Sequence, residues 1–429
     1  MITSEWKRQL AAGNYDGKLL DIYGDGQEVA RQKVRYEKAL MAFETNFGEI
    51  EVCVFSAPGR SEIGGNHTDH QHGEVLAASI HLDAIGVAGK APDGRVTIAS
   101  DAYEEIVVDT RNLAPVEKEK GTTTALVKGV LAGLKERGYR IGGFCAYVTS
   151  DVLIGAGLSS SAAYETLIGT MVSGLYNEMN IDPVQIAMVG QYAENLYFGK
   201  PCGLMDQMAC SVGGLVHIDF RNPHQPLVEK VEFDMNDYGY SLCITDTKGS
   251  HADLTDDYAA VPKEMKAVAA CFGKEYLIDI TMQDLLGSMA QVRSKCGDRA
   301  VLRALHFLNE NVRVQKEVEA LRLEDMDTFF ATVKESGDSS YKYLQNVYTN
   351  HDVTHQNVSL ALALSDMYLQ GKGVSRVHGG GFAGTIQAFV KNEDVEGYQT
   401  YMDAVFGKGA CSALRVRKYG GMKVGGRFS

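Results

Sequence analysis

The sequence predicts a protein of mixed helices and strands that is divided into more than one domain. Its 429 residues correspond to about two to three domains of ordinary size. Apolar strand-like runs, such as 144–148 and 240–245, alternate with helix-like segments such as 162–175. The Arg-Asn-Pro-His-Gln-Pro stretch at 221–226 has the composition of a loop, and we expect a domain boundary there.

The periodicity of apolar residues places the other elements along the chain. Residues 121–138 carry Leu126, Val130, Leu131 and Leu134 on one helical face, which is typical of an amphipathic helix. A strand is expected to begin at 51–55 and to end at Ala57-Pro58-Gly59, where proline and glycine interrupt it. We further expect helices within 1–48, 185–197 and 262–369, and strands at 75–87 and 240–245.

Composition limits the classes of partner and the cellular location. The chain has 42 Lys and Arg against 55 Asp and Glu, a net charge of −13 that disfavours nucleic acid and anionic membranes. Residues 1–10 lack the apolar segment of a signal peptide, and no run approaches the roughly 18 apolar residues of a membrane span. The eight Cys form no C-x-x-C pair, so we expect a cytoplasmic protein with free thiols. The sequence gives no indication of the oligomeric state.

The stretch 152–165 contains two glycines and three serines between an apolar run and a helix-like run. Such a loop lets the backbone approach a ligand closely, and the helix that follows presents unpaired N–H groups and a positive end. These features favour a phosphate site. The alternative interpretation is a serine-rich helix cap on a flexible turn.

A second polar stretch, 56–73, lies between two strand-like runs. Side chains of this density between strands indicate a site formed by loops at one end of a sheet. His67, His70 and His72 near Asp69 also allow a metal site, although their spacing is irregular. A solvated polar turn is the third interpretation.

Two further stretches carry candidate chemistry. Asp206 lies among Leu204, Met205 and Met208, so its carboxylate is either satisfied by nearby N–H groups or poised for function. Residues 379–381 are three consecutive glycines, and an apolar strand-like run follows them. Glycine-rich loops beside strands therefore occur in three separate parts of the chain.

Together these stretches resemble the motifs of the superfamily of galacto-, homoserine, mevalonate and phosphomevalonate kinases. The segments 57–60 and 63–69 are similar to the first motif of the galactokinase family, 157–163 to the phosphate loop, 201–207 to the segment with the catalytic Asp, and 379–384 to the third motif. The resemblance implies an α+β, two-domain fold. Residues 1–225 would form a mixed-sheet domain, and residues 226–429 a domain of helices over an antiparallel sheet. ATP and the sugar would bind in the cleft between them.

The resemblance also implies residue roles in an ATP-dependent sugar-1-kinase. Asp206 would be the catalytic base and Arg60 its partner. Ser161 and Glu194 would bind Mg²⁺, which prefers oxygen ligands. The implied ATP contacts are Gly155, Ala156, Gly157, Leu158, Ser159, Ser160, Ser161, Gly379, Gly380 and Gly381. The implied sugar contacts are Arg60, Asn66, His67, Asp69, Gly203, Asp206 and Tyr258.

Three positions depart from the galactokinase pattern. Asn66 stands where the family has Glu, His70 stands where it has Tyr, and the Trp and Tyr often found before a Val-Lys-Gly segment are missing before Val127-Lys128-Gly129. An amide both donates and accepts hydrogen bonds, so Asn66 would also tolerate a carboxylate on the sixth carbon of the sugar. We predict phosphorylation of D-galactose at the anomeric hydroxyl, with galacturonate as the alternative substrate.

Two other classes of function were considered. The His-Gly-Gly-Gly run at 378–381 resembles an esterase oxyanion loop, but the chain lacks the G-x-S-x-G nucleophile elbow of such enzymes. A non-catalytic sugar sensor on the same fold stays open, because a fold does not determine a function. An assay for ADP release distinguishes the sensor from the kinase.

Overall fold

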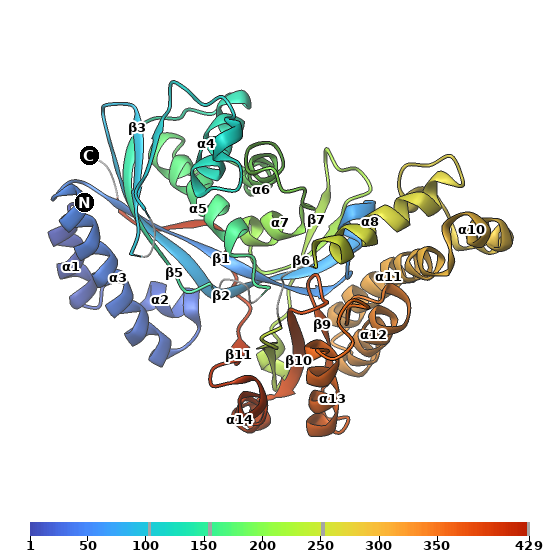
Figure 1. The fold of residues 1–429 in the computed structure, drawn as a ribbon. Helices are drawn as coiled ribbons and strands as arrows, with labels where there is room; N and C mark the ends of the chain where they lie inside the picture. Colours follow the sequence, from blue (N-terminus) through green and yellow to red (C-terminus); the bar gives the residue numbers. More distant parts are fainter. Residues whose placement is uncertain (102–103, 153–156, 250–253, 427–429) are drawn as a thin grey trace.

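A large mixed β-sheet organises the N-terminal part of the chain (Figure 1). The computed structural model describes residues 1–101, 104–152, 157–249 and 254–426. The strand order is β12-β1-β2-β5-β3-β4, and β6 and β7 extend the sheet beside the first half of β2. The β3–β5 pair is parallel and the other pairs are antiparallel. The strands are β1 (Cys53–Gly64), β2 (Glu74–Lys90), β3 (Arg95–Ala99), β4 (Ile106–Asp109), β5 (Phe144–Ser150), β6 (Leu215–Asp219), β7 (Leu227–Val231) and β12 (Met422–Gly425).

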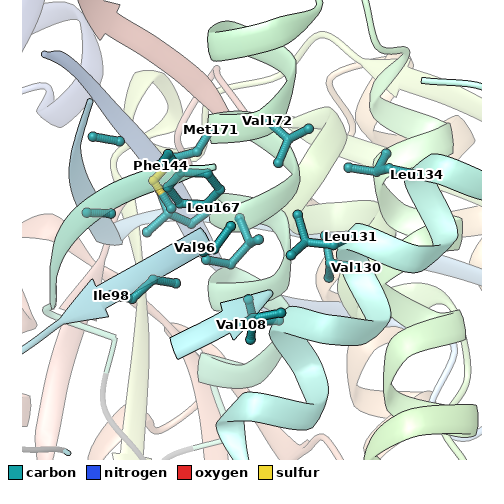
Figure 2. Packing of buried hydrophobic residues seen from close by; sticks show 14 of the residues in the cluster. Val96, Ile98, Val108, Val130, Leu131, Leu134, Phe144, Leu167, Met171 and Val172 are labelled. Atoms are coloured by element: carbon teal, nitrogen blue, oxygen red, sulfur yellow. The ribbon is translucent and has the colours of Figure 1, made fainter. Parts of the chain in front are cut away.

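Helices cover both faces of this sheet because its strands are apolar on both sides. Val54 packs in a cluster with Leu40 of α3, whereas the next residue, Phe55, packs on the opposite face with Leu167 of α5. Figure 2 shows this second cluster, in which Phe144 lies against α5. The helices of this half are α1 (Thr3–Ala11), α2 (Asp16–Tyr23), α3 (Gly26–Phe47), α4 (Thr123–Glu136), α5 (Ser160–Tyr176), α6 (Pro183–Tyr192) and α7 (Met205–Val212), with the short helices η1 (Asp69–Gln71) and η2 (Glu117–Glu119) and the π-helix η3 (Ala193–Phe198).

A second, antiparallel sheet with the order β11-β8-β10-β9 forms the centre of the C-terminal part. Ile386 of β10 packs with Val358 of α13 on one face, and Phe389 packs with Phe329 of α12 on the other. The strands are β8 (Tyr240–Asp246), β9 (Val374–His378), β10 (Thr385–Lys391) and β11 (Cys411–Leu414). The helices are α8 (Thr255–Ala270), α9 (Met282–Gly287), α10 (Met289–Cys296), α11 (Asp298–Arg322), α12 (Met326–Ser339), α13 (Asn357–Leu369) and α14 (Val395–Phe406), with the short helices η4 (Met235–Tyr238), η5 (Leu277–Asp279) and η7 (Asn392–Asp394) and the π-helix η6 (Ser340–Leu344).

The two-domain α+β architecture confirms the predicted fold class. The predicted boundary after residue 225 does not leave the larger sheet to the N-terminal part alone. Strands β7 and β12 both follow residue 225, and both pair with strands of the larger sheet. The boundary between residues 225 and 226 therefore stays a prediction. Among the described residues, no helix is long and apolar enough to cross a membrane.

One expectation about β1 was wrong. The strand does not end at Pro58-Gly59 but continues to Gly64, and its register with β2 shifts between Pro58 and Arg60. A bulge of this kind accommodates proline within a ladder. Arg60 and Glu62 consequently stand on a strand that is paired to β2, which holds their backbones more firmly than a loop would.

Candidate functional site

The glycine-rich loops and the first polar stretch, far apart in sequence, meet at one place in the fold. Asn66 donates from Nδ2 to the carbonyl oxygen of Gly379 at 2.7 Å, and His67 Nε2 lies 3.0 Å from that of Gly380. A methyl group added at Gly157 would lie 3.3 Å from Nδ1 of His378, so the phosphate loop adjoins the end of β9. The structure therefore brings together three motifs that are spread over some 330 positions of the sequence.

Arg60 and Asp206 form an ion pair beside the phosphate loop, in which Arg60 is buried and Asp206 is partly exposed. Arg60 Nε lies 2.7 Å from Asp206 Oδ1, and Ser159 donates its hydroxyl to the other carboxylate oxygen. Arg60 also donates through its backbone N–H to the Leu158 carbonyl at 3.1 Å and through its guanidinium to the Gly157 carbonyl. Burial acts to raise the pKa of Asp206, but Arg60 and Ser159 outweigh it and hold the pKa below its usual value.

Two helices begin beside this pair. Helix α5 begins at Ser160 directly after the loop, and α7 begins at Met205, so Asp206 lies in its first turn. Gly157 and Ser159 have positive φ angles of 67° and 56°, which turn the chain sharply into α5. Leu158 is buried in the core and contributes its backbone, whereas Ser160 and Ser161 are half-buried at the helix start. Gly155 and Ala156 lie outside the described residues.

Asp69 and Gly203, both predicted sugar contacts, lie against each other. A Cβ at Gly203 would come within 1.7 Å of Asp69 Oδ2, so a side chain at position 203 would displace the carboxylate. Both residues line a cavity of about 190 Å³ together with His70, His72, Gln191, Cys202, Leu204, Phe220, Pro223, Lys266 and Tyr276. The polar stretch 56–73 is thus part of a pocket. Within it, His72 stacks on Tyr276 with ring centroids 3.8 Å apart.

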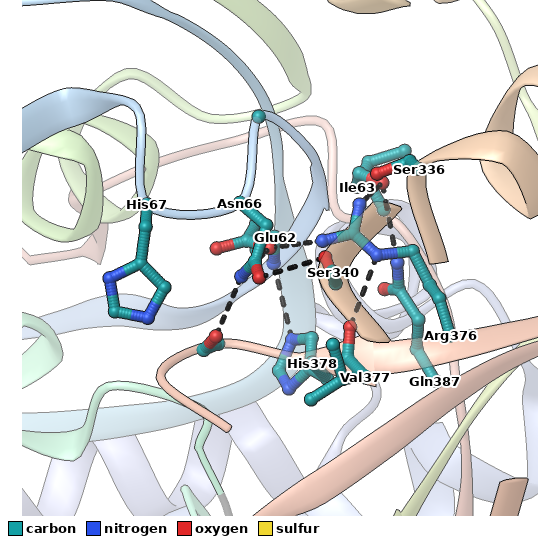
Figure 3. Close-up of polar contacts among 12 residues, drawn as sticks. Glu62, Ile63, Asn66, His67, Ser336, Ser340, Arg376, Val377, His378 and Gln387 are labelled. Carbon is teal, nitrogen blue, oxygen red and sulfur yellow. Dashed lines mark hydrogen bonds and ion pairs between the residues drawn. The ribbon is translucent and has the colours of Figure 1, made fainter. Parts of the chain in front are cut away.

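The structure places three other predicted sugar contacts against the third glycine loop. His67 and Tyr258 reach the carbonyls of Gly380 and Gly381, and the Tyr258 hydroxyl donates over 2.9 Å. Asn66 is fully buried, and its amide lies beside Glu62 and Ser340 (Figure 3). Neighbouring protein groups occupy both ends of the amide, and the expected contact of this amide with the sugar stays a prediction.

The carbonyl groups of 379–381 are held in place by side chains. All three accept hydrogen bonds from side chains of the first motif or of Tyr258. His378 is buried, with Nε2 3.1 Å from Ser61 Oγ and accepting from the Glu62 N–H at 3.2 Å, and burial lowers its pKa well below the usual value. A neutral His378 therefore serves as a connection between β9 and β1.

Glu165, a buried acid near the start of α5, was missed in the sequence, whereas its neighbour Glu194 was predicted. Gln207 donates its amide to Glu165 at 3.1 Å and to Glu194 at 3.2 Å, which brings two carboxylates together. Burial and the nearby charge of Glu194 raise the pKa of Glu165 well above its usual value. Glu165 lies four residues after Ser161 on the same helical face, and that spacing was the available signal.

This group fits the predicted metal site. Glu194 belongs to the π-helix η3, an irregular turn that occurs frequently at functional sites. Oε1 of Glu165 is buried without a hydrogen-bond partner, and the side chains of Ser161, Glu165 and Glu194 offer the hard oxygen atoms that Mg²⁺ prefers. The donor set is therefore compatible with a small divalent cation.

Comparisons with known proteins agree with this geometry. Residues 41–90 match the galactokinase galactose-binding signature, and residues 125–214 match the GHMP kinases N terminal domain. A crystal structure of Lactococcus lactis galactokinase complexed with galactose superimposes with a TM-score of 0.77 at 23% identity, covering 91% of this chain and all of that one. A crystal structure of mevalonate kinase has a TM-score of 0.59 at 13% identity and covers 85% of this chain and 99% of that one.

Sequence relatives extend over most of the chain. A galactokinase of Streptomyces coelicolor (strain ATCC BAA-471 / A3(2) / M145) is 29% identical over 381 residues, which cover 87% of this chain and 94% of that protein. A galactokinase of Glaesserella parasuis serovar 5 (strain SH0165) is 31% identical over 360 residues, covering 82% of this chain and 89% of that protein. Because the convergent motifs, the fold and these relatives agree, the chain belongs to the galactokinase family of GHMP kinases and is a phosphotransferase that acts on a sugar hydroxyl.

Proposed function

We propose that the chain transfers the γ-phosphoryl group of ATP to the anomeric hydroxyl of D-galactose. The observation that carries the proposal is the Arg60–Asp206 pair, which lies between the phosphate loop on one side and the segment of Gly203 on the other. The galactokinase relatives and the galactose in the Lactococcus lactis structure supply the choice of sugar.

Asp206 acts as the base in this proposal. The Arg60 guanidinium keeps the carboxylate ionised, so it is ready to accept the proton of the anomeric hydroxyl as that oxygen attacks phosphorus. Arg60 is also placed to stabilise the negative charge that spreads over the transferring phosphoryl group. Ser159 fixes the carboxylate through its second oxygen, which leaves the orientation of Asp206 well defined.

The loop 155–161 and the N-terminus of α5 bind the phosphates of ATP, with Gly379, Gly380 and Gly381 on the opposite side. Ser161 and Glu194 would hold Mg²⁺, and Glu165 lies within the same group. When bound, the ion neutralises phosphate charge and orients the nucleotide.

His67, Asp69, Gly203 and Tyr258 form the sugar side of the proposed site. Asp69 accepts hydrogen bonds from sugar hydroxyls and selects the galacto configuration. Galacturonate is the less favoured alternative, since the Asn66 amide that would meet its carboxylate is buried and bonded to protein groups. The proposal includes a cytoplasmic location, since all eight cysteines are free.

A coupled assay for ADP release tests the proposal. The purified chain is mixed with ATP, MgCl₂ and, in separate reactions, D-galactose, D-glucose or D-galacturonate. We expect sugar-dependent ADP release with galactose and little release with glucose. Tight sugar binding without turnover would indicate the sensor, and turnover of galacturonate above galactose would contradict the choice of sugar.

A further inference from the structure

The backbone and the side-chain amide of Asn66 all have hydrogen-bond partners, and these partners determine the orientation of the amide (Figure 3). Nδ2 donates to Glu62 Oε1 at 3.0 Å and to the Gly379 carbonyl at 2.7 Å, and both of these atoms are acceptors. Oδ1 accepts from Ser340 Oγ at 3.2 Å and from Asn346 Nδ2 at 2.8 Å. The –NH₂ end therefore faces the third glycine loop, and the oxygen faces the turn after α12.

The backbone of Asn66 is held as well. Its N–H donates to Glu310 Oε1 at 3.3 Å, and its carbonyl lies 3.0 Å from His306 Nε2, both on α11. This side chain and backbone connect β1, the third glycine loop and α11. They do so directly before His67, in the segment that leads to Asp69.

Glu62 is oriented in turn by Arg376 of β9. Arg376 Nη2 lies 2.5 Å from Glu62 Oε1, while Nη1 donates to the Ile63 carbonyl at 2.9 Å. Both side chains are buried, and Arg376 is fully enclosed. The same carboxylate oxygen, Glu62 Oε1, thus accepts hydrogen bonds from the Arg376 guanidinium and from the Asn66 amide.

A carboxylate at position 66 would meet acceptors in this environment. The galactokinase pattern carries Glu there, whereas in this chain the carboxylate of the contacting pair is Glu62 and position 66 supplies the donor. The two positions are chemically complementary, so a carboxylate at position 66 would need a hydrogen-bond donor at position 62.

We propose that Asn66 and Glu62 are positioning residues of this kinase: they hold the third glycine loop against the first motif and so set the sugar and ATP subsites together, without contacting the sugar. This inference rests on the proposed function. It predicts that changes at position 66 alter the KM of both galactose and ATP. The reason is that this Asn66–Glu62 joint lies between the first motif, on the sugar side, and the third glycine loop, on the nucleotide side.

Several charged or titratable groups face this joint and are common to all variants below. Burial raises the pKa of Glu62 to about 7, against the opposing effect of Arg376. His306 and Glu310 on α11 face the backbone of Asn66, and burial lowers the pKa of His306. These groups are Glu62 and Arg60 on β1, Asp69 on η1, Arg376 and His378 on β9, and His306, Glu310, Arg313 and Glu317 on α11.

A double-mutant cycle tests the pairing. Asn66→Asp places two carboxyl groups about 3 Å apart, and we expect kcat/KM at pH 8 to fall by roughly 10- to 100-fold. Adding Glu62→Gln restores a donor to the new carboxylate, so the double variant should recover much of this loss. Asn309→Asp, an exposed position on α11, is the matched control and should be neutral.

The pH profile gives a readout that general destabilisation would not move. In Asn66→Asp one proton shared between the two carboxyl groups recreates a hydrogen bond, so activity relative to wild type should rise as the pH falls from 8 to 6. The wild type and Asn309→Asp provide the reference profiles. Two results together would overturn the pairing: a ratio of Asn66→Asp to wild-type activity that does not change with pH, and additive kcat/KM losses in the double-mutant cycle.

Asn66→Ser separates positioning from sugar contact and introduces no charge. We expect KM for galactose and KM for ATP to rise together, and the affinity for ATP measured without sugar to fall. A rise confined to the galactose KM would identify Asn66 as a sugar contact and overturn the proposal. If the wild type ignored galactose, the proposed function would fail, while ATP affinity and thermal unfolding would still measure the coupling between positions 62 and 66.

Discussion

Strand β1 carries two arginine–carboxylate pairs whose first members are two residues apart, and their surroundings differ. In the Arg60–Asp206 pair the carboxylate side chain is 34% exposed and lies beside the phosphate loop. In the Glu62–Arg376 pair the two side chains are 3% and 0% exposed, and they lie between β1 and β9. The first pair can meet a substrate, and the second meets protein groups.

The difference in surroundings gives opposite pKa shifts. Burial acts to raise the pKa of both carboxyl groups. For Asp206 the Arg60 and Ser159 partners outweigh burial, so the pKa falls and the group is ionised at neutral pH. For Glu62 burial outweighs Arg376, and the pKa rises to about 7. A similar ion pair therefore keeps the proposed base ionised at one position and forms a structural joint at the other.

The largest effect is expected from Asp206→Asn. This change removes the proposed base without changing the shape of the side chain, so kcat should fall by roughly 10² to 10⁴. Calorimetric titration should show that ATP still binds, because the phosphate loop is intact. Turnover close to that of wild type would remove Asp206 from the mechanism and leave the comparison between the two pairs without its catalytic member.

A smaller effect is expected from Glu194→Gln. Loss of a charged oxygen ligand should raise the Mg²⁺ concentration needed for half-maximal activity by about 10- to 100-fold, with partial recovery at high Mg²⁺. Titration of activity with MgCl₂ measures this effect. Glu178→Gln, at an exposed position, is the control. An unchanged Mg²⁺ requirement would separate Glu194 from the metal site.

Glu62→Gln should change the pH dependence of stability. The pKa of Glu62 is about 7 in the folded state and near its usual value of 4.5 when unfolded. Between these values the folded state binds more protons, so wild-type stability falls as the pH rises. The thermal midpoint of Glu62→Gln relative to wild type should therefore increase between pH 5 and pH 8. If the thermal midpoint of Glu62→Gln relative to wild type decreased between pH 5 and pH 8, the raised pKa of Glu62 would be contradicted.

The smallest effect is expected from Tyr258→Phe. This variant loses the hydroxyl that donates to the Gly381 carbonyl, a hydrogen bond of ordinary length that contributes roughly 0.5–1.5 kcal/mol. We expect kcat/KM to fall by about 2- to 10-fold in the coupled assay. Tyr341→Phe, on an exposed side chain, should show no effect. A loss as large as that of Asp206→Asn would mean that Tyr258 takes part in the chemistry.

The sequence could predict the chemical pair because its members lie in short recognisable motifs. Arg60 follows Ala57-Pro58-Gly59, and Asp206 lies within Pro201 to Gln207, so the resemblance identified both. The two-domain fold followed from the same resemblance. The course of β1 was wrong, because a bulge lets the strand continue past Pro58.

The structural joint could not be predicted in the same way. The Glu62–Arg376 contact spans 314 positions, and nothing in the local sequence of either residue indicates that they meet. The amide of Asn66 was expected to face the sugar because the galactokinase pattern has Glu at this position. Its orientation depends on Gly379 and on Asn346, which tertiary packing alone brings to it.

The position of the transferred phosphate tests the central claim most directly. Galactose, ATP and MgCl₂ are incubated with the enzyme, and the product is examined by phosphorus NMR with detection of the coupled proton. We expect a single phosphate ester coupled to the anomeric proton, formed by Asp206→Asn at least about 100-fold more slowly than by wild type. A phosphate on another carbon, or equally fast product formation by Asp206→Asn, would contradict the central claim.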